Sequence, residues 1–190
     1  SEKFKFNKEK RFHIRSQFNI SNDFVVGTVG RLSETKNSKY LVSLLPDLLK
    51  ENPNTTVMFV GEGSIKDEIA NLANELKVRN HVIFAGAQDD TQAFYSAFDV
   101  FALPSLYEGL PLVVLEAQFN GLPCIISLGS SDECIISSNV KRISCNDSRQ
   151  WVSAILNSER KTNSIIEKRA NKFELSSIRP IASKLFGTLS

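Results

Sequence analysis

Residues 104–117, with the sequence PSLYEGLPLVVLEA, predict a loop followed by a helix, and the apolar run directly before them predicts a strand. Pro111 suits the first turn of the helix, because that turn needs no N–H from it and the proline ring already holds a helical φ. Gly121 suits the position after the last helical residue. We therefore expect Glu108 in the loop and Glu116 about one turn inside the helix.

The start of this helix is predicted to bind an anion. The N–H groups of Gly109, Leu110 and the first helical residues lack partners within the helix, and the helix dipole adds partial positive charge beside them. The carboxylates of Glu108 and Glu116 indicate a ligand with hydroxyls as well as phosphates, because carboxylates accept hydrogen bonds from hydroxyl groups. A nucleotide-sugar carries both kinds of group.

The length and composition narrow the class of protein. The chain of 190 residues is long enough for one domain with its own core, and its formal net charge of +2 gives no reason to expect nucleic acid as a partner. The three cysteines lack Cys-x-x-Cys spacing, so we expect no disulfide and no zinc site, and a reducing, cytoplasmic compartment. No apolar run approaches the roughly 20 residues of a membrane span.

Short apolar runs alternate with longer segments of helical period along the chain. This pattern predicts an α/β domain with a Rossmann-like, doubly wound parallel sheet that has helices on both faces. About six strands are expected, at residues 24–29, 57–60, 82–85, 100–103, 123–127 and 140–144. Further helices are expected at residues 38–50, 65–77, 149–156, 164–173 and 177–189.

The loops after the strands are expected to carry the ligand site, because ligands bind outside the carboxyl ends of the strands in such sheets. In the first of these loops, Gly30 is followed by Arg31 and Lys36. Arg31 supplies a planar fork for two phosphate oxygens and Lys36 a mobile point charge, so the two can converge on one diphosphate. The alternative interpretation is a pair of ordinary surface cations.

Three glycines are predicted to line the same site. Gly61 and Gly63 follow the second strand, where the lack of a side chain lets a ligand approach the backbone or simply lets the chain turn. Gly86 follows the third strand and offers backbone groups to a base. Lys66 stands where the dinucleotide fingerprint needs a third glycine, which disfavours a nicotinamide or flavin domain.

The remaining candidate residues are interpreted as structural. His13 and His81 are the only histidines, and they lack the spacing of metal ligands. The basic run with interleaved phenylalanines at residues 3–12 is interpreted as the solvated beginning of a helix, with contact to an anionic membrane as the alternative.

Residues 11–156 together resemble the nucleotide-sugar-binding half of the retaining GT-B glycosyltransferases of family four, and within it the enzymes of capsular and exopolysaccharide synthesis. The resembling segments are VGTVGRLSETKN, VMFVGEGSIKDEI, HVIFAGAQDD and FDVFALPSLYEGLPLVVLEAQFNGLPCIIS. The last segment is the most specific, because it carries the Glu-x7-Glu motif of the family as Glu108 and Glu116. At Lys36-Asn37, where much of the wider family has Lys-Gly, the chain is similar to the polysaccharide branch.

The resemblance implies a role for each matching residue. Arg31 and Lys36 match positions that bind the donor diphosphate and stabilise the departing nucleotide. Glu108 matches the glutamate at the hydroxyls of the transferred sugar, and Glu116 matches the one on the ribose hydroxyls. The expected donor is an NDP-sugar, with a UDP-sugar favoured, and the expected acceptor is a saccharide or lipid-linked saccharide. No metal or cofactor is implied, because the cations and the helix dipole act on the leaving group instead.

The whole chain, residues 1–190, corresponds to one nucleotide-sugar-binding domain, the C-terminal half of a GT-B enzyme. The acceptor domain of such enzymes lies outside this chain, so we expect the chain alone to bind nucleotide and to transfer sugar weakly or not at all. A nucleotide-sugar 2-epimerase and a non-catalytic, nucleotide-binding regulatory module are the alternatives. Peripheral association of the full-length enzyme with the inner face of the membrane is left open.

Overall fold

The computed structural model describes residues 2–160 as a six-stranded parallel sheet covered by helices. The strands are β1 (Phe24–Val29), β2 (Thr55–Val60), β3 (Val82–Gly86), β4 (Val100–Leu103), β5 (Cys124–Ser127) and β6 (Val140–Ile143). Their order across the sheet is β3-β2-β1-β4-β5-β6, and all neighbouring pairs are parallel. This is the strand order of the doubly wound, Rossmann-like fold, so the predicted fold class is confirmed.

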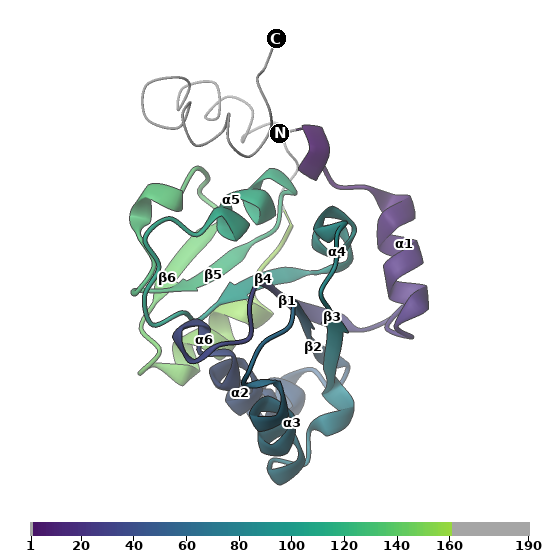
Figure 1. The fold of residues 1–190 in the computed structure, drawn as a ribbon, viewed down its shortest axis with the longest axis vertical. Coiled ribbons are helices and arrows are strands. Elements are labelled where there is room, and N and C mark those ends of the chain that lie inside the picture. Colours follow the sequence, from purple (N-terminus) through teal and green to yellow (C-terminus); the bar gives the residue numbers. More distant parts are fainter. Residues whose placement is uncertain (1, 161–190) are drawn as a thin grey trace.

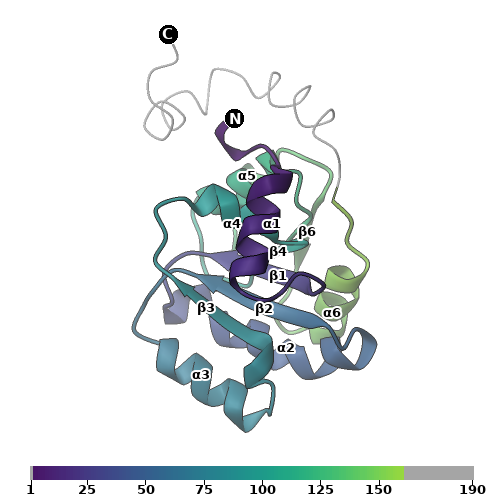
Figure 2. The ribbon, with the colours of Figure 1, turned by 90° about the vertical axis from the view of Figure 1, so that its right-hand side faces the viewer.

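The helices form one layer on each face of the sheet. One layer consists of α1 (Lys8–Gln17), α4 (Thr91–Ala97) and α5 (Leu112–Phe119), and the other of α2 (Ser38–Glu51), α3 (Lys66–Glu75) and α6 (Ser148–Leu156). Figure 1 shows the strands between the two layers, and Figure 2 shows α1, α4 and α5 above the sheet with α2, α3 and α6 below it.

Each layer encloses its own apolar core. Tyr95 and Phe101 are fully buried in the core beneath α1, α4 and α5, whereas Trp151 and Leu45 are fully buried in the core beneath α2, α3 and α6. Every residue of β2 and β4 is buried, as expected for parallel strands that have helices on both sides. The strands therefore appear in the sequence as continuous apolar runs.

The structure differs from the predicted elements in two places. β2 begins at Thr55, two residues before the predicted start, because hydrogen bonds satisfy its two buried threonine hydroxyls: Thr55 Oγ1 donates to the Asn52 carbonyl at 2.8 Å and Thr56 Oγ1 to Asp23 at 2.5 Å. The helix α4 was not predicted, because five of its seven residues are buried and no polar face marks its period.

The other element bounds fall close to the predictions. The remaining strands agree within one residue, and α1 begins at Lys8, inside the basic run that was interpreted as a helix start. The helices predicted at residues 164–173 and 177–189 lie outside the described residues. In the part of the chain that the structure describes, no helix is both long and apolar enough to cross a bilayer.

Candidate functional site

Two loops meet where the strand order of the sheet reverses. Residues 30–37 connect β1 to α2, residues 104–111 connect β4 to α5, and β1 and β4 are neighbours in the sheet. The Leu106 N–H donates to the Thr35 carbonyl at 2.8 Å, and these two loops are therefore joined. The candidate residues of both loops come together at the switch point of a doubly wound sheet, which is where such folds bind ligands.

An ion pair between Lys36 and Glu108 spans the two loops, with Lys36 Nζ against Glu108 Oε1. The same carboxylate oxygen accepts a hydrogen bond from Ser105 Oγ at 2.9 Å. The pair is partly shielded, because 25% of the Lys36 side chain and 15% of the Glu108 side chain are exposed. Asn37 follows Lys36 with a φ of 51°, a left-handed conformation that asparagine and glycine tolerate best.

Arg31 is exposed and has no ion-pair or hydrogen-bond partner within residues 2–160. The backbone around it is fixed, since the Gly30 N–H donates to the Val60 carbonyl at 2.9 Å and the Leu32 N–H to the Glu62 carbonyl at 3.0 Å. The Arg31 guanidinium is therefore free to bind an anion. We call Arg31, Lys36 and Glu108 the switch-point cluster.

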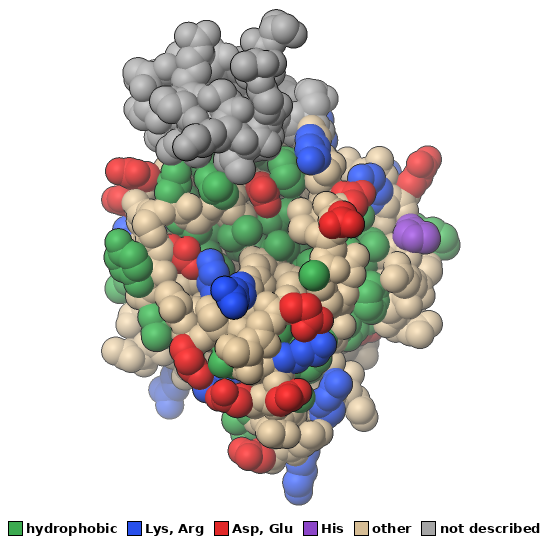
Figure 3. Space-filling model, viewed as in Figure 1, with side chains coloured by type: hydrophobic (Ala, Val, Ile, Leu, Met, Phe, Trp, Pro, Cys, Tyr) green, Lys and Arg blue, Asp and Glu red, His purple; other side chains and the backbone are tan. Residues whose placement is uncertain are grey.

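The switch-point cluster belongs to a face of mixed charge. In Figure 1 the loop from β1 to α2 lies in front of the sheet. Figure 3, from the same side, shows basic and acidic side chains beside one another near the middle of this face, with hydrophobic side chains above them. A ligand with both anionic and hydroxyl groups can therefore find partners for both kinds of group within this face.

The start of α5 adds unpaired N–H groups to the same place. The helix begins at Leu112, so Pro111 caps it instead of forming its first turn. The N–H groups of Gly109 and Leu110 donate no hydrogen bond to any described residue. Gly109 is exposed, and a Cβ built on it would meet nothing within 4 Å. Free donors therefore lie beside the positive end of a helix, next to the open space around Gly109, as an anion site requires.

Glu116 lies in the second turn of α5 and is half-buried. Its Oε2 accepts a hydrogen bond of 2.7 Å from the hydroxyl of Tyr95 in α4. Burial raises the pKa of Glu116, and the Tyr95 hydrogen bond and the charge of Lys3 partly oppose this rise. Sequence reasoning missed Tyr95, because the helix that carries it was not predicted.

Gly61, Gly63 and Gly86 hold neighbouring loops together. A Cβ on Gly61 would lie 2.1 Å from the Gly30 carbonyl oxygen, and a Cβ on Gly63 would lie 2.0 Å from that of Leu32. The Gly61 N–H donates to the Gly86 carbonyl at 2.8 Å. The close backbone approach at these glycines is thus to other loops, and ligand contact at them stays a prediction.

The loop after β5 supports Glu108 and was also missed. The Glu108 N–H donates to the Gly129 carbonyl at 2.9 Å, and the Ser131 N–H donates to the Glu108 carbonyl at 3.1 Å. A Cβ on Gly129 would lie 2.1 Å from the Leu106 carbonyl oxygen, so a larger residue would push the two loops apart. No local motif signals this contact, because it joins residues that are far apart in sequence.

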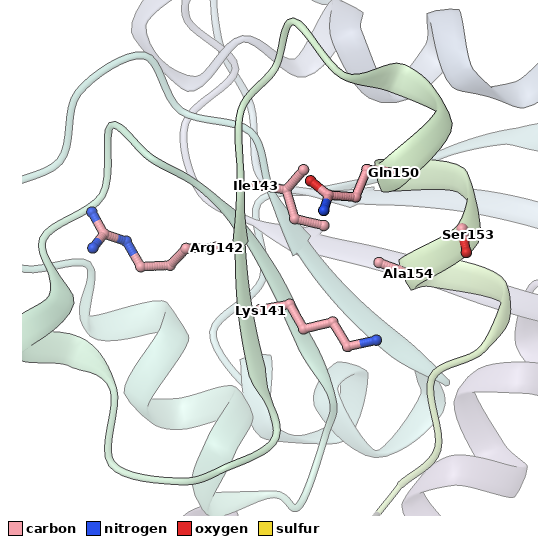
Figure 4. Close-up of a pocket in the computed structure, with 6 residues that line it drawn as sticks. All are labelled: Lys141, Arg142, Ile143, Gln150, Ser153 and Ala154. Carbon is pink, nitrogen blue, oxygen red and sulfur yellow. The ribbon is translucent and has the colours of Figure 1, made fainter.

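A cavity of about 410 Å³ lies between β6 and α6, at the edge of the sheet (Figure 4). Lys141, Gln150 and Ser153 line it, and none of the predicted site residues does. Arg142 also borders the cavity, but in Figure 4 its side chain points away from Lys141, and it donates to the Ser130 carbonyl at 2.8 Å.

The described residues offer no clear metal centre. Within them, no three His, Cys, Asp or Glu side chains are grouped so that they could hold a metal ion. Cys124, Cys134 and Cys145 are free thiols, and burial raises the pKa of Cys134 to about 11. His81 Nδ1 lies 3.0 Å from the Thr55 carbonyl oxygen, a structural contact.

The fold and these loops define a Rossmann-like α/β domain whose polar groups gather at the switch point of the sheet. The family model described as glycosyl transferases group 1 matches residues 9–172. The chain therefore belongs to this family.

Two curated relatives are much longer than the chain. One is a UDP-Gal:alpha-D-GlcNAc-diphosphoundecaprenol alpha-1,3-galactosyltransferase of Escherichia coli, 32% identical over 140 residues, or 71% of this chain and 36% of the relative. The other is the Vi polysaccharide biosynthesis protein VipC/TviE of Salmonella typhi, 35% identical over 115 residues, or 60% of this chain and 20% of the relative. The chain thus spans about a third or less of the length of these relatives.

Solved structures share the fold. Anabaena Alr3699/HepE, in complex with UDP and glucose, superposes with a TM-score of 0.80 at 22% identity, over 99% of this chain and 54% of that one. The C-terminal domain of LpcC, a glycosyl transferase group 1 family protein from Francisella tularensis, gives a TM-score of 0.70 at 18% identity, over 100% of this chain and 98% of that one. These likenesses concern the fold alone, which is that of one half of the GT-B fold.

Proposed function

We propose that the chain is the nucleotide-sugar-binding half of a retaining glycosyltransferase that moves a hexosyl group from a UDP-sugar to a saccharide or lipid-linked acceptor in surface polysaccharide synthesis. The observation that carries this proposal is the meeting of the switch-point cluster with the free N–H groups of Gly109 and Leu110. Cations and N–H groups suit the phosphates of the donor, and the carboxylate suits its sugar hydroxyls.

The names of similar proteins support the choice of ligand. The Escherichia coli relative is named for a UDP-galactose donor and a lipid-linked acceptor, and the Anabaena structure contains UDP and glucose. The Salmonella relative is named for polysaccharide biosynthesis. We infer the same classes of donor, acceptor and pathway for the protein to which this chain belongs.

In the proposed reaction, Arg31 and Lys36 bind the diphosphate of the donor, and Glu108 binds hydroxyls of the transferred sugar. The bond between the anomeric carbon and the diphosphate oxygen breaks, and its electron pair goes to that oxygen. The acceptor hydroxyl forms the new bond on the same face of the sugar and gives its proton to the departing phosphate. The two cations and the start of α5 stabilise the negative charge as it develops, so the proposal needs no metal and no cofactor.

A second domain is proposed to bring the acceptor to this site. Transfer requires donor and acceptor in reacting geometry, so we expect the chain alone to bind donor and to transfer sugar slowly or not at all. The two alternatives predict other results. A 2-epimerase would change the sugar of the donor without an acceptor, and a regulatory module would bind nucleotide without transfer even in the full-length protein.

Calorimetric titration of the purified chain with UDP, GDP and UMP, in the presence of a chelator, tests the proposal. We expect saturable binding of UDP and weaker binding of UMP, because UMP lacks the second phosphate. The double variant Arg31→Ala, Lys36→Ala should lose UDP binding. Lys39→Ala is a matched control, because Lys39 already pairs with Glu34 and Glu68 at 2.9 and 2.8 Å. Failure of every nucleotide to bind, or unchanged binding by the double variant, would contradict the proposal.

A further inference from the structure

The hydroxyl of Tyr95 is a polar group inside an aromatic core. Tyr95 is fully buried, and its ring packs edge-on against Phe4 and Phe98 with centroid distances of 6.0 and 6.1 Å. Phe101 lies 5.9 Å away on another side. A ring enclosed in this way cannot swing elsewhere, so the core fixes the position of its hydroxyl oxygen.

Among the described residues, that hydroxyl donates to a single acceptor, the Oε2 atom of Glu116, at 2.7 Å. Burial and the neighbouring carboxylate raise the pKa of Tyr95 well above its ordinary value, so the hydroxyl keeps its proton and acts as the donor. The other carboxylate oxygen of Glu116, Oε1, has no hydrogen-bond partner among the described residues. One oxygen is thus held by the protein and the other is left for a ligand.

The helix that carries Tyr95 is itself fixed by three arginines. Arg11 Nη1 donates to the Phe98 carbonyl at 2.9 Å, and Arg15 Nη1 donates to the Ala97 carbonyl at 2.8 Å. Arg160 Nη2 donates to the carbonyls of Phe98 and Tyr95 at 2.7 and 3.2 Å. These cations also match the negative end of the α4 dipole, so the C-terminal end of α4 has little freedom to move.

We infer that Tyr95 is a positioning residue for ribose recognition: it holds Oε2 of Glu116 so that Oε1 accepts a hydrogen bond from the ribose of the nucleotide. This inference rests on the proposed function, in which Glu116 binds the ribose hydroxyls. It adds a residue outside the binding loops, on a helix that ligand need not touch. Arg11, Arg15 and Arg160 support the same geometry by fixing α4.

The test compares UDP with 2′,3′-dideoxy-UDP, which lacks both ribose hydroxyls, on wild-type protein and Tyr95→Phe. Wild-type protein should bind UDP more tightly than the dideoxy nucleotide. Tyr95→Phe should bind UDP about fivefold more weakly than wild-type protein, which is the usual scale of one hydrogen bond. Its affinity for the dideoxy nucleotide should be unchanged. Glu116→Gln should also lose the preference for UDP over the dideoxy nucleotide. Tyr40→Phe is the matched control, because the buried Tyr40 hydroxyl has no partner among the described residues.

The outcomes separate the inference from the proposed function. If wild-type protein binds neither nucleotide, both fail. If wild-type protein binds UDP and the dideoxy nucleotide equally, the result supports the diphosphate site but contradicts ribose recognition by Glu116. If Tyr95→Phe keeps the full preference for UDP, or weakens both nucleotides equally, Tyr95 has only a structural role. Should Tyr95→Phe not fold, wild-type protein labelled with fluorotyrosine gives the same answer, because the Tyr95 fluorine signal should respond to UDP and not to the dideoxy nucleotide.

Discussion

Two places in the molecule set cations around one carboxylate, and they differ in what satisfies the cations. The arginine cluster consists of Arg11, Arg15 and Arg160 with Asp99, and its guanidiniums donate to backbone carbonyls at the end of α4 as well as to the carboxylate. The switch-point cluster has a single ion pair and an arginine without any partner among the described residues.

The comparison distinguishes charged side chains that stabilise the fold from those that are available to a ligand. A buried cation must be compensated, so the arginine cluster carries its own acceptors; burial and the two neighbouring arginines lower the pKa of Arg160 to about 10. In the switch-point cluster, by contrast, Arg31 is exposed and has no partner among the described residues. Cations that the fold does not use are the ones available to a ligand.

The largest expected effect comes from the arginine cluster. Asp99→Ala should lower the free energy of unfolding by about 3 kcal/mol, because Asp99 pairs with Arg11 at 2.6 Å and also accepts from the Val25 N–H at 2.8 Å. Urea denaturation measures this loss. Asp90→Ala is the control: Asp90 pairs with Lys10 but is 54% exposed, and its loss should cost under about 1 kcal/mol. Equal losses in both variants would contradict the structural role of the arginine cluster.

The next effect concerns binding at the switch-point cluster. Arg31→Ala should weaken UDP binding by roughly 1.5 to 3 kcal/mol, the range for a hydrogen bond to a charged group, with no change in the urea midpoint. Lys36→Ala should weaken binding similarly but should also destabilise the fold slightly, because it leaves the mostly buried Glu108 carboxylate without its cation. Calorimetry and urea denaturation of both variants distinguish these results. A large loss of stability in Arg31→Ala would show that Arg31 has a structural role.

A smaller effect of opposite sign is expected at Glu108. Glu108→Gln should tighten binding of free UDP by about 0.5 kcal/mol, because it frees Lys36 from its ion pair and removes a negative charge near the phosphates. The same variant should weaken binding of a UDP-sugar relative to free UDP. Titration of both ligands measures the two changes. Weaker binding of free UDP would mean that Glu108 holds Lys36 in place for the diphosphate.

The smallest expected effect is a dependence of stability on pH. Burial raises the pKa of Glu116 in the folded protein above its unfolded value. The folded state therefore binds the proton more tightly, and this contribution to stability is fully present below the unfolded pKa and is lost as pH rises through the folded pKa. The free energy of unfolding of Glu116→Gln, relative to that of wild-type protein, should therefore increase as the pH rises from mildly acidic to neutral. Urea midpoints across that range measure the change, and a flat difference would place Glu116 in a solvated environment.

The sequence predicted the parts of the site that lie in one local motif. Glu108, Gly109 and Leu110 follow from one strand, loop and helix, and Arg31 and Lys36 follow from the rule that ligands bind after the strands. The fold class was also predictable, because apolar runs alternate with helical segments along the chain. The structure places these residues together, and their roles toward a ligand stay proposals.

Other features depend on contacts between distant residues and leave no local signal. Tyr95 reaches Glu116 from a helix without a polar face, and Gly129 supports Glu108 only because two loops touch. The arginine cluster joins α1 to the end of α4. Its Arg11 belongs to the basic run that was interpreted as solvated, because sequence alone cannot show which lysines and arginines turn inward. The hydrogen-bond partners of a side chain are hardest to predict when they are backbone carbonyls, since any carbonyl can accept the bond.

The most direct test of the central claim is an amide NMR titration of the purified chain with UDP in the presence of a chelator. We expect large shifts of the Gly109, Leu110 and Arg31 amides and none at Ala97 and Phe98, whose carbonyls accept from the arginine cluster. We expect no shifts at all in the double variant Arg31→Ala, Lys36→Ala. Shifts confined to the cavity between β6 and α6, or shifts at Gly109 and Leu110 that persist in the double variant, would contradict the claim.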